Sequence, residues 1–441
     1  MKTLPYIAPI KKQSFSFSTF GLAKKITFHF SLFTFHSKSI LISGFLLLTL
    51  NVINGQSLNT IIEEALENSP EIQKFELKYR IASEKVNEVN TIPNTEFGVG
   101  YFISEPETRT GAQRFKVSAK QMMPWFGTIS SREDYVSSLA EATYEDIAIA
   151  KRKLIAAVSQ FYYNLYSNNA RQLVLIENIG LLETYETLAL TSVEVGKASA
   201  VDVLRLQMRK NELDQIKQVL EQQYLGEQTA LNKLLNRDND VEITSINELI
   251  IPSEDFEIIT ENLALHPELL KYDKLYQSVE QSELLNQKES SPMIGFGLDY
   301  INVEKRPDMS FSDNGKDIIM PMVSVSIPIF NKKYKSETKQ NELQRQEIVA
   351  QKQERLNMLE TLLGKAMNDR ISARISYNTQ TKNLRQAKDA EDILIRSYET
   401  GTIDFNDVLD IQELQLKFQM NQIESVKTYY VQTTIINYLT N

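Results

Sequence analysis

The chain has 441 residues and no cysteine, which excludes disulfides, thiolate metal sites, a cysteine nucleophile and a lipid-carrying cysteine. The formal net charge of −9 becomes −15 for residues 56–441, where 42 basic residues stand against 57 acidic ones. An acidic surface argues against nucleic acid or anionic lipid as a partner.

The first 55 residues have the charge order of a secretory signal. Six lysines precede an apolar run of 14 residues at 40–53, and no acidic residue appears before Glu63. The run is shorter than the roughly 18 residues that indicate a transmembrane helix. We expect cleavage after Gly55, and we interpret residues 1–38 as an extension from an upstream start codon. A permanent N-terminal membrane anchor is the alternative.

The rest of the sequence contains two copies of one plan. Four landmarks recur in the same order at offsets of 197, 197, 204 and 205 residues. One is VEVGKASAVDVLRLQ at 193–207, which returns as YETGTIDFNDVLDIQ at 398–412. A period of this length indicates duplicated domains rather than a solenoid of small repeats. We expect repeat 1 at 56–238, a linking equatorial segment at 239–259 and repeat 2 at 260–441.

Each copy is predicted to contain a helix broken at a proline, two strands, a very long helix, a tight turn and another long helix. Pro70 and Pro267 mark the breaks. No proline occurs between Pro124 and Pro252 or after Pro328, and apolar residues seven apart predict coiled-coil packing of the long helices. The predicted helices are at about 58–90, 128–195 and 201–236 in repeat 1, and at about 260–290, 332–398 and 403–439 in repeat 2.

The predicted strands lie at about 94–104, 112–123, 293–303 and 317–328. They alternate apolar residues with small or charged ones over about ten residues, which is typical of a strand between lipid and a water-filled lumen. A strand half-buried on a soluble core is the alternative. Because four strands cannot close a barrel, and an open edge is excluded from lipid, several chains would share one barrel. Aromatic residues near the strand ends suit a membrane interface: Tyr101, Trp125, Phe126, Tyr300 and Phe330.

The chain resembles the TolC family of outer-membrane efflux proteins over the length that follows the signal. Two helix-turn sequences carry the resemblance. The first runs from Val195-Gly196 to Asp202-Val203-Leu204 and Gln207, and the second comprises Tyr398, Gly401, Asp407-Val408-Leu409-Asp410 and Gln412. The strand ends Pro124-Trp125-Phe126-Gly127 and Pro328-Ile329-Phe330 agree with it.

The resemblance implies a mainly α fold with a membrane β-barrel portion. Three chains would build a twelve-stranded barrel in the cell outer membrane and a twelve-helix tube, or α-barrel, across the periplasm. Such a homotrimer serves as the channel-tunnel of a tripartite efflux or type I secretion system. Its partners would be outer-membrane lipid, a periplasmic adaptor and an inner-membrane pump. The residues implied at the periplasmic tip, where an adaptor binds, are Val195, Gly196, Asp202, Tyr398, Gly401 and Ile403.

Asp407 and Asp410 match the acidic residues that the family often carries at the tip constriction. Threefold symmetry would place six carboxylates around the entrance, where we expect them to favour cations. The alternative is that they only stabilise the start of a helix. Ile403 is apolar where a polar or basic side chain could latch the closed state, so the latch residues stay undetermined.

No enzyme motif of the GxxxxGK[ST], GxSxG, HExxH or GxGxxG type occurs, so we expect no catalysis and no cofactor. His266 is the one histidine after the signal, and its His-Pro context predicts a helix start rather than a metal ligand. We therefore expect no metal site. The alternative function is a secreted or periplasmic coiled-coil scaffold without a pore. The sequence does not name the cargo.

Overall fold

The computed structural model describes residues 57–196, 199–243, 249–255 and 257–441, which belong to one compact unit, Asn54–Asn441. The expected signal at 1–55 lies outside these residues. In the described part of the chain, no helix is both long and apolar enough to cross a membrane.

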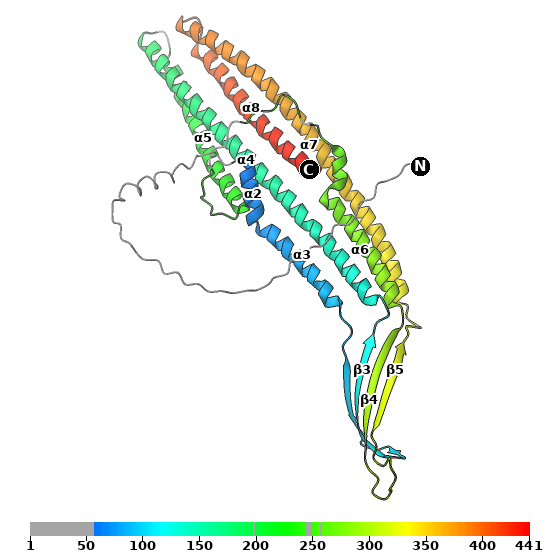
Figure 1. The fold of residues 1–441 in the computed structure, drawn as a ribbon. Helices are drawn as coiled ribbons and strands as arrows, with labels where there is room; N and C mark the ends of the chain where they lie inside the picture. The colour runs from blue at the N-terminus through cyan, green and yellow to red at the C-terminus, as the bar shows by residue number, and fades with distance from the viewer. Residues whose placement is uncertain (1–56, 197–198, 244–248, 256) are drawn as a thin grey trace, which may run out of the picture. The chain divides into compact units, whose positions relative to one another are not determined.

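Helices and strands follow one another in a similar order in both halves of the chain (Figure 1). The first half contains α2 (Leu58–Asn68), α3 (Pro70–Val89), β1 (Glu96–Tyr101), β2 (Glu107–Thr108), β3 (Gly111–Met123), α4 (Thr128–Glu194) and α5 (Ala200–Leu234). The second half contains η1 (Thr260–Leu265), α6 (Pro267–Glu289), β4 (Met293–Val303), β5 (Ile318–Ser326), α7 (Lys333–Glu399) and α8 (Phe405–Thr440).

Two details differ from the sequence-based expectation. The short strand β2 pairs with the start of β3, in a segment expected to be a plain loop, because Gly111 turns the chain back with a φ of 133°. The helix at 260–290 is interrupted before Pro267 as predicted, but its first piece is a 3-10 helix rather than an α-helix. His266 adopts an extended backbone before Pro267, so a 3-10 turn precedes α6.

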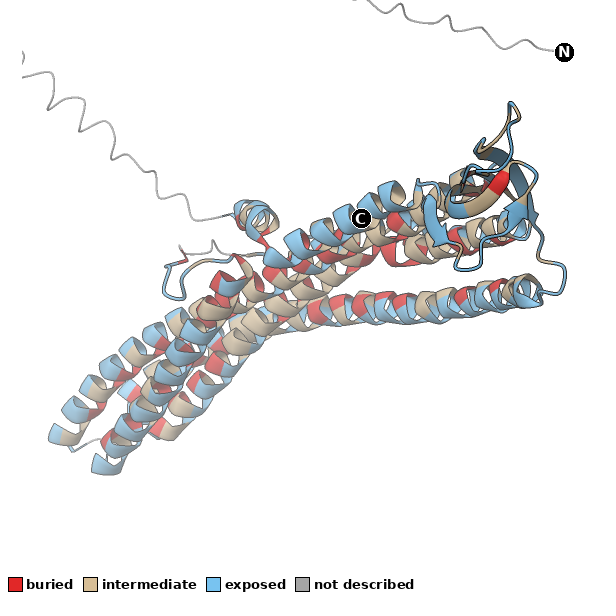
Figure 2. Ribbon diagram, turned by 90° about the horizontal axis from the view of Figure 1, so that it is seen from below, coloured by how far each residue is buried: buried red, intermediate tan, exposed pale blue. Residues whose placement is uncertain are grey.

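The long helices are joined by narrow apolar seams. α4 and α7 have 67 residues each, which corresponds to about 100 Å at 1.5 Å per residue. Buried positions recur along the facing sides of the helices (Figure 2). Seven-residue spacing sets these seams, as in Leu175, Leu182 and Ala189 of α4 and Leu206, Leu213 and Leu220 of α5.

The helices beside the sheet follow the same side-by-side order as the strands to which they are joined. The antiparallel sheet has the order β1-β3-β4-β5, and α3 leads into β1, β3 into α4, α6 into β4 and β5 into α7. Next to the sheet, α4 packs against α3 and α6, and α6 packs against α7. Farther away, α5 replaces α3 beside α4, and α8 replaces α6 between α4 and α7. The short helices therefore stack end to end beside the two long ones.

Candidate functional site

One face of the sheet is apolar across all four of its main strands. The register places Val99, Val117, Tyr300 and Ile319 in one row that crosses the sheet. The exposed fractions of the exposed apolar side chains on this face range from 36% at Phe115 to 81% at Val99. A continuous exposed apolar surface marks contact with a membrane or with another protein. Its other members are Phe97, Tyr101, Phe296, Leu298, Val323 and Val325.

The opposite face of the sheet carries glycine, serine and charged residues together with a few methionines and isoleucines. Ser118 lies between Gly98 and Asp299 in the register, and its hydroxyl donates to the carbonyl oxygen of Gly98 at 3.3 Å. A Cβ atom on Gly98 would lie 2.7 Å from the Ser118 hydroxyl, so the glycine makes room for this neighbour. The carboxylate of Asp299 is fully buried and pairs with the Lys116 ammonium group.

Both outer strands of the described sheet have an open edge. β1 pairs with β3 on one side, and β5 pairs with β4 on one side. Pro321 lies within β5, and a proline is tolerated in an edge strand because it lacks the amide donor. The helices lie beyond the end of the sheet rather than on its faces (Figure 1).

The aromatic residues predicted at the strand ends lie at both ends of the sheet. Trp125 and Phe126 follow β3 at the helical end, with ring centroids 5.8 Å apart, and Phe330 follows β5 and is 98% exposed. Tyr101 and Tyr300 lie toward the loop end of their strands. β4 spans 11 residues, which is the length of a strand that crosses a bilayer at a tilt.

Two glycine turns join the long helices at the end far from the sheet. At the second turn, the Gly401 amide donates to Tyr398 O at 2.9 Å and the Thr402 amide to Ser397 O at 3.0 Å. This pair of hydrogen bonds requires a residue in the left-handed conformation, and Gly401 has a φ of 74°. Gly196 has a φ of 72° at the first turn, where residues 197 and 198 lie outside the described chain.

The predicted tip residues have different surroundings. Val195 is exposed, and Ile403 packs partly against the core. Asp202 caps α5, because its carboxylate accepts the Ser199 amide at 3.3 Å in a capping box. Tyr398, another residue predicted at the tip, has a side chain that is only 7% exposed. It continues the heptad seam of α7, which carries its ring inward.

A buried polar contact near these turns joins the two helical hairpins, α4–α5 and α7–α8. The Tyr185 hydroxyl of α4 donates to Glu391 Oε1 of α7 at 2.6 Å. Gln415 of α8 donates to Glu391 Oε2 at 2.8 Å. The Glu391 carboxylate thus holds donors from two other helices while it is 8% exposed. Burial and the bond to Glu391 raise the pKa of Tyr185.

Sequence reasoning missed this contact, although a signal was present. Glu391 lies seven residues from Leu384 and from Tyr398, at a seam position where apolar residues are expected. A charged residue at such a position needs a buried partner. The partner, Tyr185, is 206 residues away in the chain.

Asp407 and Asp410 are exposed on α8, on the side opposite to the buried Phe405 and Val408. Neither carboxylate lies in the core. Glu424 follows Asp410 by fourteen residues, or two heptads, and therefore lies on the same face of α8.

The helical layer has one apolar and one polar face at mid-length. Two grooves lie beside α8, one lined mainly by apolar residues and one by polar residues. The α8 residues that line the first are half a helical turn from those that line the second, so the grooves lie on opposite faces of the helical layer. The apolar groove is lined by Leu173, Val174, Leu384, Ile423 and Val426 together with Leu249 and Ile250. The polar face is lined by Asn164, Ser167, Asn168, Arg171, Ser372, Ser376, Asn421 and Ser425.

His266 starts α6, as its His-Pro context predicted. Its Nδ1 atom accepts the Glu268 amide at 3.3 Å, and the side chain is fully buried. Burial, with help from the positive charge of Arg152, lowers the pKa of His266 to about 4. Among the described residues, no group of three or more histidine, aspartate or glutamate side chains is placed to hold a metal ion.

No protein-family model matches the chain, and no curated protein matches it. Several solved membrane channels do match. CusC shares 14% identity over 87% of this chain and 92% of its own, with a TM-score of 0.72. The outer membrane channel CmeC of Campylobacter jejuni shares 15% identity over 88% of this chain and 86% of its own, with a TM-score of 0.69. The chain has the fold of these channels.

The MtrE outer membrane channel of Neisseria gonorrhoeae, solved in its open state, also shares the channel fold. It matches at 15% identity over 87% of this chain and 88% of its own, with a TM-score of 0.69. The expected fold class, mainly helical with an antiparallel sheet, is confirmed. In a single chain the sheet is open.

Proposed function

We propose that the protein is the outer-membrane channel-tunnel of a tripartite efflux or type I secretion system, formed by three copies of the chain. The two-faced sheet with open edges carries this proposal. Hydrocarbon leaves no partner for an unpaired backbone group, so β5 of one copy must pair with β1 of the next. Three sets of four strands close a twelve-stranded barrel with the apolar face toward lipid.

The helices continue this barrel as a tube across the periplasm, with their polar face toward a water-filled lumen. The polar side chains on one face of α4, α7 and α8 support this orientation. Exposed apolar residues on the outer helices of the layer support packing between copies. They include Val201, Leu204 and Met208 on α5, and Ile371 and Ile375 on α7.

The tip is the proposed gate. The Tyr185–Glu391 bond holds the two hairpins together near their turns, and separation of the hairpins must break it. The exposed carboxylates of Asp407 and Asp410 share a face of α8 with Asn421 and Glu424, which supports their place in a ring at the entrance.

The first turn offers a docking surface for a periplasmic adaptor. Val195 and the neighbouring Leu190 are exposed apolar side chains at this turn. The exposed Gly401 turn completes the tip, whereas the buried Tyr398 contributes only by packing in the core beneath it. In this proposal the protein is a conduit rather than an enzyme, and an inner-membrane pump selects the cargo.

Outer-membrane fractionation and planar-bilayer recording of the detergent-purified protein test the proposal. We expect a trimer whose gel mobility changes on heating, and discrete conductance steps. A coiled-coil scaffold would wash off the membrane and give no steps. A protein that is monomeric and water-soluble without detergent would refute the proposal.

A further inference from the structure

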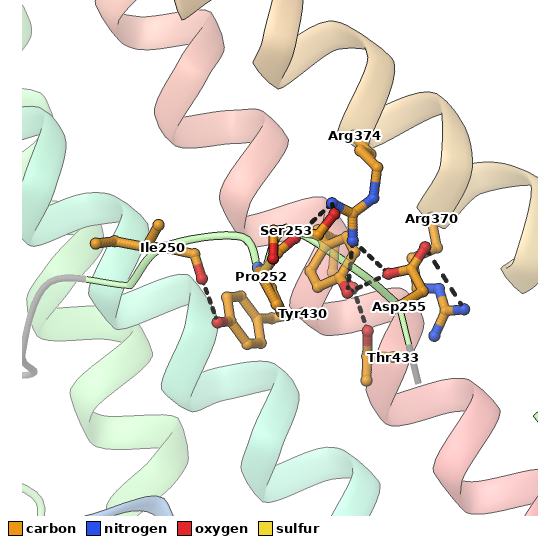
Figure 3. A network of polar contacts seen from close by, with 9 residues as sticks. Ile250, Pro252, Ser253, Asp255, Arg370, Arg374, Tyr430 and Thr433 are labelled. Atoms are coloured by element: carbon orange, nitrogen blue, oxygen red, sulfur yellow. Dashed lines mark hydrogen bonds and ion pairs between the residues drawn. The ribbon is translucent and has the colours of Figure 1, made fainter. Parts of the chain in front are cut away.

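The segment Leu249–Asp255, here called the strap, contacts both helical hairpins. On α4, the Tyr166 hydroxyl lies 3.4 Å from both the amide nitrogen and the carbonyl oxygen of Leu249. On α8, the Tyr430 hydroxyl donates to Ile250 O at 2.7 Å (Figure 3). The next residue, Ile251, is buried in a core cluster with residues from α4, α7 and α8.

The far end of the strap is fixed to α7 and α8 by a compact polar network (Figure 3). The Asp255 Oδ1 atom accepts hydrogen bonds from Arg374 and from the Tyr429 hydroxyl, both at 2.5 Å. Arg374 also donates to Pro252 O at 2.5 Å and to Ser253 O at 3.3 Å. Its guanidinium carbon lies 5.2 Å from the centre of the Tyr429 ring. One arginine thus binds two consecutive carbonyl groups of the strap backbone and the Asp255 carboxylate.

The buried cation of Arg370 needs the strap, because the strap supplies its counter-charge. Its side chain is 8% exposed, and its nearest acidic group is the Asp255 carboxylate, at 3.9 Å. A buried cation without a counter-charge is costly, so loss of the strap would leave Arg370 unfavourable inside α7. Burial disfavours the charge on Asp255, but the bonds from Arg374 and Tyr429 outweigh it and hold the pKa of Asp255 below its usual value.

The strap lies well away from the contact that joins the hairpins near the turns. Arg374 precedes Glu391 by seventeen residues on α7, which is about 26 Å along the helix. Tyr166 precedes Tyr185 by nineteen residues on α4, or about 29 Å. Breaking the Tyr185–Glu391 bond therefore leaves the hairpins joined at the strap.

We propose that the strap is a fixed clamp between the two hairpins, which limits how far their turns can separate. The clamp itself does not depend on the proposed function. Only its effect on conductance rests on that function. If the protein is a channel gated at its tip, the clamp sets the width of the open entrance.

The test compares Asp255→Asn and Tyr429→Phe with Glu254→Gln, which makes the same charge change at the exposed neighbouring residue. Because the chain has no cysteine, a reporter pair can be introduced as Arg205→Cys and Asn406→Cys, whose side chains contact each other across the hairpins. The rate of disulfide formation in this pair then measures separation near the turns in the assembled full-length protein.

We expect Asp255→Asn to slow disulfide formation several-fold, Tyr429→Phe to slow it less, and Glu254→Gln to leave it unchanged. Tyr429→Phe keeps the aromatic ring and the Arg374–Asp255 pair, so it remains informative if Asp255→Asn fails to assemble. Unchanged rates in both strap variants would overturn the clamp. A slowed rate without any bilayer conductance in the unmodified protein would keep the clamp and refute the channel.

Discussion

The hydroxyl oxygen of Tyr185 lies 2.6 Å from Glu391 Oε1, so one hydrogen bond joins helices that belong to different halves of the chain. Both side chains are buried, and the aromatic rings of Tyr185 and Phe405 pack with centroids 5.7 Å apart beside this bond. Separation of the two hairpins near their turns cannot occur while the bond is intact.

Tyr185→Phe should favour the open state of the tip. A hydrogen bond to a charged group contributes about 1.5–3 kcal/mol, so its loss should raise the open-to-closed ratio by about 10- to 150-fold. Single-channel recording in planar bilayers measures this ratio. The control is Tyr144→Phe, which removes the hydroxyl of a half-exposed tyrosine on the same helix. Equal open probability in the two variants would remove the bond from the gate.

Asp410→Asn, alone and with Asp407→Asn, should weaken cation selectivity. Six carboxylates around a narrow entrance attract cations, and the double substitution removes all of them from the trimer. Reversal potentials in a potassium chloride gradient report the change. Glu221→Gln is the control, because it removes the same charge from an exposed position on a different helix, α5. If selectivity stays the same, the two aspartates act only at the helix start.

Val323→Lys should prevent insertion, whereas Ser324→Lys should be tolerated better. The two residues are adjacent in β5, and Val323 lies on the apolar face with 71% of its side chain exposed. A lysine on the lipid face of a barrel costs about 2–4 kcal/mol near the membrane midplane, whereas the lumen face accepts charge. Heat-modifiable trimer on a gel of outer-membrane fractions measures insertion. Equal yields would argue that the apolar face does not meet lipid.

His266 should make the protein sensitive to mild acid. The pKa of His266 is about 4 in the folded protein and 6.5 in the unfolded chain, so the unfolded chain takes up the proton first as the pH falls. Stability contributed by the neutral ring is complete above pH 6.5 and is lost as the pH falls toward 4. The loss should reach about 3 kcal/mol.

His266→Asn tests this effect, because asparagine also accepts a hydrogen bond at a helix start but does not titrate in this range. Thermal unfolding midpoints between pH 7 and pH 4 should fall less steeply for the variant than for the unmodified protein. The comparison of slopes is insensitive to a uniform loss of stability from the smaller side chain. Parallel pH profiles would show that protonation of His266 does not limit acid stability.

Much of the architecture follows from local pattern. Seven-residue apolar spacing without proline predicts long paired helices, and period-two alternation predicts strands with one apolar face, because each pattern places like side chains on one side of its element. The break at Pro267 and the positive φ at Gly196 and Gly401 are likewise local, since backbone geometry depends on the residue itself.

The sequence by itself therefore determined the kinds of element, their order and the two-faced character of the strands. Only the tertiary structure decided which distant residues meet. Tyr185 finds Glu391, and Asp255 finds Arg374 and Arg370, across 206, 119 and 115 residues. A heptad pattern shows that Glu391 and Arg370 are charged where a seam should be apolar, but it cannot name their partners, because a partner depends on how helices from different halves of the chain lie side by side.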